Sequence, residues 1–478
     1  MLQPNPMLVN QPVSFLLNED FTSLNDMRLG GLCPQPLTNS IRQIIRKPYQ
    51  QNKIMWVGHS KGNLTAKSAY SADGEPETWK SNETGTQLEP DEDAGTITKD
   101  DDLELERQLK RLNKPYVKTI KTEVDDIYDC IDIRKQPSLD HPLLQNHEIQ
   151  ASGFVAIMHP TTCPKRMYSK TGMVDKHNVA QKDLITVDCP EGTVPIRRIE
   201  RQDLIRARSF TESYGTYQPS QSTPLSPGEH VAILRSKTMK VVHGIAGYLS
   251  LHNLSQWVKP GQSSSAHMWI ESRLGNNVSS LQTGWMVSPQ FYGDTKTRLF
   301  VFSKFNNNKG CFNLLCSNFV QINSRNPVDI VFNKTSEIDK EPFVIPIRIF
   351  HDKGTHNWWL QVNDDVNVGY WPSGTFPDMN NGASYVAWGG LAQGLTYVPS
   401  PPLGNGNLPD PDSPDATETA YIRLLQIFDL SDWLNISEND VEEYVDNYDC
   451  YDVKYMKYQG EAKGHVMYYG GHGGNCGN

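Results

Sequence analysis

The second half of the chain alternates between hydrophobic and polar residues with a period of two. Stretches such as TRLFVFSKF (297–305) and FVIPIRIF (343–350) are rich in aromatic and β-branched residues and are separated by Gly, Asn, Asp and Pro. Because successive side chains of a strand point to opposite faces, this pattern predicts half-buried strands. Many such strands without long amphipathic helices predict an all-β fold, an antiparallel β-sandwich or barrel of roughly 240 residues.

The stretch WWLQVNDDVNVGYW (358–371) predicts one hairpin of this sheet, with its turn at residues 363–365. The side chains of its first strand are expected to divide between the two faces. One face would carry Trp358, Leu360 and Val362, and the other Trp359, Gln361 and Asn363.

The first half of the chain has a different pattern. Leucines recur at near-helical spacing from Leu103 to Leu112 and Pro115 ends the run, so residues 102–115 predict a helix. The segment TYQPSQSTPLSPGEH (216–230) is rich in Gly, Pro and Ser and predicts an exposed linker of the kind that proteases cut. The expected division is an N-terminal extension at 1–100, a small α+β domain at 101–207, a linker at 208–230 and a β-sandwich domain at 231–478.

Residues 1–100 have little periodicity, and the stretch at 71–102 is polar and acidic, so the extension is expected to be largely disordered. Gly58, Ser60 and Gly62 match the G-x-S-x-G nucleophile elbow, but an elbow needs a large parallel sheet that these residues are too few to build. Residues 52–71 are similar instead to a stretch near the end of plant retroelement reverse transcriptases. On this interpretation the segment is an exon wrongly joined to the gene.

Composition narrows the class of protein. The balance of 45 basic against 55 acidic residues gives a net charge of -10, which argues against nucleic acid as the main partner. No run of about 18 apolar residues exists, so no transmembrane helix is expected. The eight cysteines include no C-x-x-C pair, which favours disulfides over zinc.

The signals for secretion disagree with one another. The N-terminus has neither a basic region nor a long apolar stretch, so no signal peptide is visible. Glycosylation sequons, which agree with passage through the secretory pathway, occur at Asn253, Asn277, Asn333 and Asn435.

Several long motifs in residues 102–478 carry a family resemblance. The first half contains LERQLKRLNKPYVKTIKTE and CPEGTVPIRR, and the second contains GWMVSPQFYGDTKTRLFVF, GCFNLLCSNFVQIN and AWGG. In this order they resemble the neprosin family, plant secreted peptidases with an activation peptide and a peptidase domain. The resemblance implies a secreted zymogen, in which a prodomain covers a groove that binds extended, proline-containing peptides. No cofactor is expected.

The resemblance also implies how the cysteines pair. Two cysteines, Cys33 and Cys163, are left over. The pairs are Cys311 with Cys316, Cys450 with Cys476, and Cys130 with Cys189.

Glutamic peptidases need two acidic side chains that face each other across the groove. One carboxylate takes a proton from the attacking water, and its protonated partner polarises the scissile carbonyl and protonates the departing nitrogen. The family's two glutamates correspond here to Gln282 and Leu391. An amide is not a general base, and leucine has no polar group at all. Of the nearest acids, Glu271 is expected to be a solvated strand residue and Asp294 to shape a turn.

Two further groups of side chains are candidates for binding. Histidines at 351, 356, 465 and 472 have no spacing typical of zinc or non-haem iron, so no metal is expected. A large set of aromatic residues exceeds what a sandwich core requires, and some are expected to line a substrate groove, where proline and sugar rings both stack. This set is Trp285, Tyr292, Trp358, Trp359, Tyr370, Trp371 and Trp388.

The sequence therefore predicts a secreted, neprosin-like glycoprotein whose peptide-binding groove has lost its acidic pair and cuts poorly or not at all. One alternative is an active prolyl endopeptidase in which another acid serves. Another is a protein that binds glycans or the cell wall through its aromatic face.

Overall fold

The computed structural model describes residues 99–149, 159–161 and 186–478, apart from 215–216, 221–224, 307–309, 338, 411, 413 and 477–478. The expectations for the extension at 1–98, including the Ser60 motif, and for Cys33 and Cys163 lie outside the described residues.

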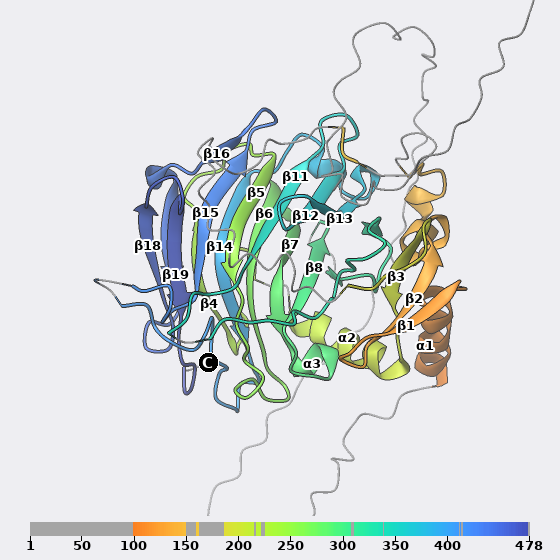
Figure 1. Cartoon of the computed structure of the whole chain (residues 1–478), viewed down its shortest axis with the longest axis horizontal. Helices are drawn as coiled ribbons and strands as arrows, with labels where there is room; N and C mark the ends of the chain where they lie inside the picture. Colours follow the sequence, from red (N-terminus) through yellow and green to blue (C-terminus); the bar gives the residue numbers. More distant parts are fainter. Residues whose placement is uncertain are drawn as a thin grey trace, which may run out of the picture. The chain divides into compact units, whose positions relative to one another are not determined.

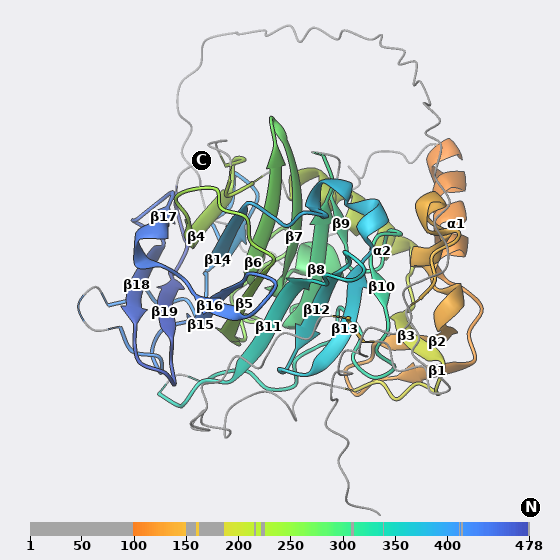
Figure 2. The ribbon, with the colours of Figure 1, turned by 90° about the horizontal axis from the view of Figure 1, so that it is seen from above.

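Two antiparallel sheets form the C-terminal β-sandwich, and Figures 1 and 2 show them as two layers. The first has seven strands, in the spatial order β17 (Val441–Val445), β4 (Glu229–Ser236), β14 (Tyr385–Gln393), β6 (Ser263–Leu274), β7 (Asn277–Val287), β8 (Arg298–Lys304) and β9 (Cys311–Phe312). The second has nine, in the order β10 (Val320–Gln321), β13 (Val366–Trp371), β12 (Trp358–Val362), β11 (Val344–His351), β5 (Gly244–Ser250), β15 (Tyr421–Phe428), β19 (His465–Gly470) and β18 (Asp452–Tyr458), with β16 (Trp433–Asn435) paired to β15.

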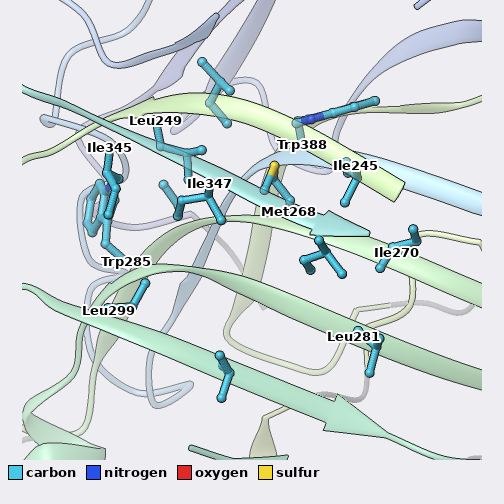
Figure 3. Close-up of a cluster of buried hydrophobic side chains, with 14 of the residues drawn as sticks. Ile245, Leu249, Met268, Ile270, Leu281, Trp285, Leu299, Ile345, Ile347 and Trp388 are labelled. Atoms are coloured by element: carbon cyan, nitrogen blue, oxygen red, sulfur yellow. The ribbon is translucent and has the colours of Figure 1, made fainter. Parts of the chain in front are cut away.

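The main hydrophobic core lies between the two sheets. Met268 and Ile270 of β6 pack in one buried cluster with Ile245 and Leu249 of β5 (Figure 3). Since alternate side chains of the central strands enter this cluster, the alternating pattern of the sequence corresponds to the core of a sandwich.

The predicted hairpin at 358–371 is confirmed. Its strands β12 and β13 pair in antiparallel register, and the turn residues Asn363 and Asp364 have φ angles of 51° and 67°. Such left-handed conformations at both central positions are those of the tight turns that suit twisted strands. The side chains divide between the faces as the alternation predicts, because Trp358 lies in the core between the sheets and Trp359 lies in a separate cluster.

A small α+β region precedes the sandwich. It contains α1 (Lys99–Leu112), a three-stranded antiparallel sheet of β1 (Lys118–Lys121), β2 (Ile127–Asp132) and β3 (Thr193–Arg197), and α2 (Arg201–Ser213). The predicted helix at 102–115 corresponds to α1, which ends three residues before Pro115. The short helical turns in the part of the chain that the structure describes are η1 (Ile133–Lys135), η2 (Pro137–Asp140), η3 (Pro142–Leu144), α3 (Pro289–Tyr292), η5 (Ser373–Thr375), η6 (Pro377–Met379) and η7 (Glu438–Asp440).

All three predicted disulfides are confirmed. Cys130 and Cys189 join two distant parts of the N-terminal region, across 59 residues of sequence. Within the sandwich the bonds are Cys311–Cys316 and Cys450–Cys476.

Buried polar contacts join the α+β region to the sandwich. The Arg298 guanidinium of β8 donates to both carboxylate oxygens of Asp126, at 2.7 and 2.9 Å, and to Asp294 at 2.6 Å. The Gln136 side chain exchanges hydrogen bonds with the backbone of Gln321, donating at 3.0 Å and accepting at 2.9 Å. These polar groups are buried away from water, and a buried polar group without a hydrogen-bond partner lowers stability. Each group therefore needs its partner when the two regions pack together.

Breaking the buried ion pair is expected to destabilise the protein far more than breaking an exposed one. Arg298→Met leaves the Asp126 carboxylate buried without its partner, which is expected to lower the free energy of unfolding by about 3 to 5 kcal/mol. The matched control is Arg325→Met, since the Arg325–Asp188 pair joins the same two regions with side chains 60% and 69% exposed. That change is expected to cost at most about 1 kcal/mol. Denaturant unfolding measures both, and equal losses would contradict the assignment.

Candidate functional site

The strand register places Gln282 and Leu391 on one face of the seven-stranded sheet. Gln282 of β7 lies opposite Trp269 of β6, which lies opposite Ala387 of β14. Directly paired residues share a face, and so do residues an even number of positions apart on a strand. Leu391 follows Ala387 by four positions, so it lies on the same face as Gln282, with β6 between their strands.

His267 lies in the middle of this face. Its neighbours in the two adjacent strands are Gly284 and Gly389, so no side chain flanks it across the sheet. The imidazole packs on Trp269, with ring centroids 3.7 Å apart, and is fully buried. Neither ring nitrogen has a hydrogen-bond partner among the described residues, and burial lowers the pKa of His267 well below its ordinary value. The face therefore contains a neutral imidazole between positions 282 and 391.

Glu271 lies on the same face, which corrects the expectation that it is solvated. It is two positions from Trp269 on β6 and is fully buried. Burial raises the pKa of its carboxyl from 4.5 to about 7, and hydrogen bonds from Ser220 and Ser280 and the charge of Lys304 oppose that rise. The exposure was misjudged because the residues that cover Glu271 come from far away in the sequence.

Hydrogen bonds connect Glu271 to position 282. The Gln282 amide donates to the Ser280 hydroxyl at 3.2 Å, and that hydroxyl in turn hydrogen-bonds the Glu271 carboxyl. Ser280 therefore lies between the Gln282 amide and the carboxyl of Glu271.

Residues of the N-terminal region and the expected linker cover this face. Phe210 of α2 and Tyr214 pack in one buried cluster with Trp269, Phe302 and Leu391. Further along, the buried residues are Tyr217, Gln218 and Pro219. The prediction of an exposed segment at 216–230 is therefore wrong for residues 217–219, because Tyr217 packs in the apolar cluster of this face and its two neighbours are buried with it.

The structure corrects the predicted aromatic groove. Four members of the set lie in the core between the sheets, and their indoles are enclosed there. They are Trp285, Trp358, Trp371 and Trp388. Trp359 and Tyr370 lie in another cluster, where the Tyr370 hydroxyl hydrogen-bonds His147 of the N-terminal region at 2.7 Å.

Tyr292 is the remaining member of the predicted aromatic set. It belongs to the cluster of the covered face, but its hydroxyl accepts from Asn313 at 3.2 Å. The aromatic residues that do lie on the covered face, such as Trp269 and Phe302, were missed.

The other candidate residues have structural surroundings. Asp294 accepts from the backbone N–H of Lys296 at 3.0 Å, as expected for a turn, and also binds Arg298. His351 and His356 have ring centroids 5.3 Å apart, whereas His465 hydrogen-bonds Tyr455 and His472 contacts Gly473. Within the described ranges no group of three or more His, Cys, Asp or Glu residues is placed to hold a metal ion.

The surface features are compatible with the sequons. All four sequon asparagines are exposed on the described part of the chain: Asn253, Asn277, Asn333 and Asn435. No helix among the residues that the structure describes combines the length and apolar character needed to cross a membrane.

Two family models match the chain. The model described as Neprosin matches residues 260–472, and the model described as Neprosin activation peptide matches residues 119–241. The matches bear out the resemblance found in the motifs and extend over both the α+β region and the sandwich.

Several solved structures are also similar. Scytalido-glutamic peptidase with a transition-state analogue inhibitor is 10% identical with a TM-score of 0.29, over 51% of this chain and 98% of that chain. SCP-B, a member of the eqolisin family of peptidases in a complex with the tripeptide Ala-Ile-His, is 10% identical with a TM-score of 0.27, over the same 51% and 98%. A β-porphyranase from the human gut bacterium Bacteroides plebeius is 5% identical with a TM-score of 0.18, over 33% of this chain and 54% of that chain.

The raised pKa of Glu271 gives the protein a stability that depends on pH. A carboxyl whose pKa is higher in the folded state stabilises that state fully below its unfolded pKa of 4.5, and this contribution is lost as the pH rises through about 7. A rise from 4.5 to about 7 corresponds to about 3 kcal/mol. Glu271→Gln does not titrate, so its stability relative to the natural chain should increase by up to that amount between pH 4.5 and pH 8.

Denaturant unfolding at several pH values measures this difference. The control is Glu341→Gln, which alters an exposed carboxyl and should not reproduce this increase. A pH-independent difference for Glu271→Gln would mean that Glu271 is not the buried titrating group. Lys304, Tyr217 and Tyr385 are the other ionisable groups that interact with Glu271, and all three are retained in both variants.

Proposed function

Because the chain belongs to the neprosin family, we propose that it is a secreted proprotein whose covered sheet face binds extended, proline-containing peptides and hydrolyses them poorly or not at all. The observation that carries this proposal is the chemistry of positions 282 and 391. Both lie on the covered face, and neither supplies a carboxyl group.

The loss of two acids has a direct chemical consequence. Attack by water on a peptide bond requires a base to take the proton of the water and an acid to protonate the departing nitrogen. Gln282 offers an amide, which donates one hydrogen bond to the Ser280 hydroxyl, and Leu391 is packed among apolar side chains. Losing one proton-transfer group costs about 10² to 10⁴ in rate, and here both predicted positions have lost it.

The covering segment supports peptide binding at this face. Tyr217, Gln218 and Pro219 are buried there, so the chain's own proline-containing segment lies where a peptide ligand would. The α+β region then acts as the prodomain that covers the groove.

Three disulfides support an oxidising destination, and the exposed sequons support glycosylation there. A plant origin follows only from the family resemblance. The alternative of glycan binding through the aromatic set is not favoured, because most of those side chains are in the core.

A specific observation favours a second function, slow proteolysis with Glu271 as the acid. Its pKa of about 7 keeps the carboxyl partly protonated near neutral pH, as a general acid requires. Its Oε2 accepts a hydrogen bond from the backbone N–H of Ser220 at 3.1 Å, so the carboxyl lies beside a peptide bond that follows proline. Glu229 is a second buried carboxyl on this sheet face, two positions from Val231, which pairs with Leu391.

Restoring both acids is expected to restore hydrolysis. The full chain, treated with acid and assayed on a proline-rich peptide, should show little or no turnover, whereas the double variant Gln282→Glu with Leu391→Glu should cut at least about 10²-fold faster. The control combines Gln282→Glu with Leu391→Gln, which adds a polar side chain but no second acid. Circular dichroism and the thermal midpoint confirm that each variant is folded. Robust turnover by the homogeneous natural chain would refute the proposal.

Any residual turnover should depend on Glu271 if the second function holds. Glu271→Gln removes the ionisable proton while keeping the shape of the side chain, so turnover should fall by about 10² or more. Glu229→Gln is the matched control, because it alters the other buried carboxyl of the same face. Loss in the Glu229 variant and not in the Glu271 variant would assign the acid to Glu229 instead.

A further inference from the structure

The segment that covers the sheet face makes one pair of backbone contacts with β6. The N–H of Ser220 donates to the Glu271 carboxylate at 3.1 Å. The carbonyl oxygen of the same residue accepts from the Arg273 guanidinium, also at 3.1 Å. Glu271 and Arg273 are two positions apart on one strand, so they present an acceptor and a donor side by side on the same face.

This arrangement is suited to one peptide residue in extended conformation. Both contacts are to backbone atoms, which every residue other than proline offers in the same places. Hydrogen bonds to charged groups are stronger than neutral ones, so an acidic and a basic side chain bind a backbone N–H and C=O especially well.

Both side chains also have contacts within the sandwich itself. The Arg273 guanidinium also donates from Nε to the carbonyl of Gly275 at 3.1 Å. The Glu271 carboxyl is held by the hydrogen bond from Ser280. Fixing the two charged groups in this way lowers the entropy that binding would otherwise cost.

The residue that precedes Ser220 gives the arrangement a specificity. Pro219 is buried and Tyr217 lies in the apolar cluster of the face, so the backbone contacts fall on the residue directly after a buried proline. Glu271 Oε1 has no hydrogen-bond partner among the described residues, although the carboxyl is fully buried. A buried polar atom without a partner is rare in native structures and points to a site whose proper ligand differs from its present cover.

We infer that Glu271 and Arg273 form a binding subsite for the backbone of the residue that follows proline in a bound peptide, and that residues 217–220 occupy it as an internal ligand. The inference rests on the proposed function, since it names where and how the proposed peptide ligand is held. It requires no proton transfer and holds whether or not the face hydrolyses peptides.

Hydrogen exchange in the full chain tests the internal contact. Glu271→Ala and Arg273→Met each remove one of the two bonds to Ser220, so peptides containing Ser220 should exchange their amide hydrogens about 10-fold faster or more. Peptides from β12 and β13 serve as the internal reference and should not change. Glu341→Ala is the control variant and should leave the exchange at Ser220 unaltered. Unchanged exchange at Ser220 in both variants would overturn the inference.

Peptide binding in trans tests the subsite itself. The host is the full chain with Tyr217→Ala, which weakens the internal ligand, and the probe is fluorescent acetyl-Tyr-Gln-Pro-Ser-amide. Glu271→Ala in this host should weaken binding about 10-fold or more. A probe with N-methylserine lacks the N–H and should therefore bind the host weakly. Glu271→Ala should not weaken the binding of this probe further. A probe with alanine in place of proline should also bind more weakly.

The possible outcomes separate the two proposals. If the probe binds equally well with and without Glu271 and Arg273, the subsite is refuted but the proposed peptide-binding function is not. Binding of no probe to a folded host, including longer proline-rich peptides, overturns the proposed function and the subsite with it. The exchange measurement uses the unweakened cover, so it decides the internal contact even if the Tyr217→Ala host does not fold.

Discussion

The pairing register of β6 with its neighbours is the constraint on which the rest of the structure depends. In a sheet with one face toward the core, a slip of one residue would move every side chain of a strand to the other face. The observed register directs Met268 and Ile270 into the core, and therefore directs His267, Trp269 and Glu271 to the covered face. The chemistry of the site is thus set by the same alternation that fills the core.

The covered face has an unusual balance of apolar and polar burial. Aromatic residues from α2 and from the segment that follows pack on Trp269 and Phe302, and this burial favours the covered state. The same burial removes water from His267 and from Glu271. The described residues of the cover supply Glu271 with a backbone N–H but supply the imidazole with no partner. Buried polar groups that stay unsatisfied oppose stability. The cover is therefore held chiefly by its apolar contacts, and its fit to the polar groups is incomplete.

Much of the fold was predictable from local sequence. Strand alternation, the turn at 363–365 and the leucine spacing before Pro115 all depend on neighbours within a few residues. The position of Glu271 was accessible in part. Leu274 and Asn277 flank a two-residue Gly-Asn turn, and this hairpin register alone pairs Glu271 with Ser280 and Trp269 with Gln282.

What local sequence did not contain was the identity of the covering elements. Glu271 was expected in solvent and residues 217–219 were expected to be exposed, yet each buries the other across about 50 residues of sequence. The prediction that the aromatic set lines a groove was wrong for a related reason. Alternation separates Trp358 from Trp359, but it does not say which of two faces is the core and which lies under another part of the chain.

The tether between the cover and the sheet affects how an outside peptide competes. A ligand tethered through a short segment of chain acts at an effective concentration in the millimolar range, about 1 mM. A free peptide with the same contacts would have to reach that concentration to displace residues 217–220 half of the time. Since β4 begins at Glu229, only eight residues separate Ser220 from the sheet, so the cover returns readily after each opening. Access for outside peptides therefore depends on cutting this connection or on weakening the apolar anchors of the cover, and much less on the strength of the two backbone hydrogen bonds at Ser220.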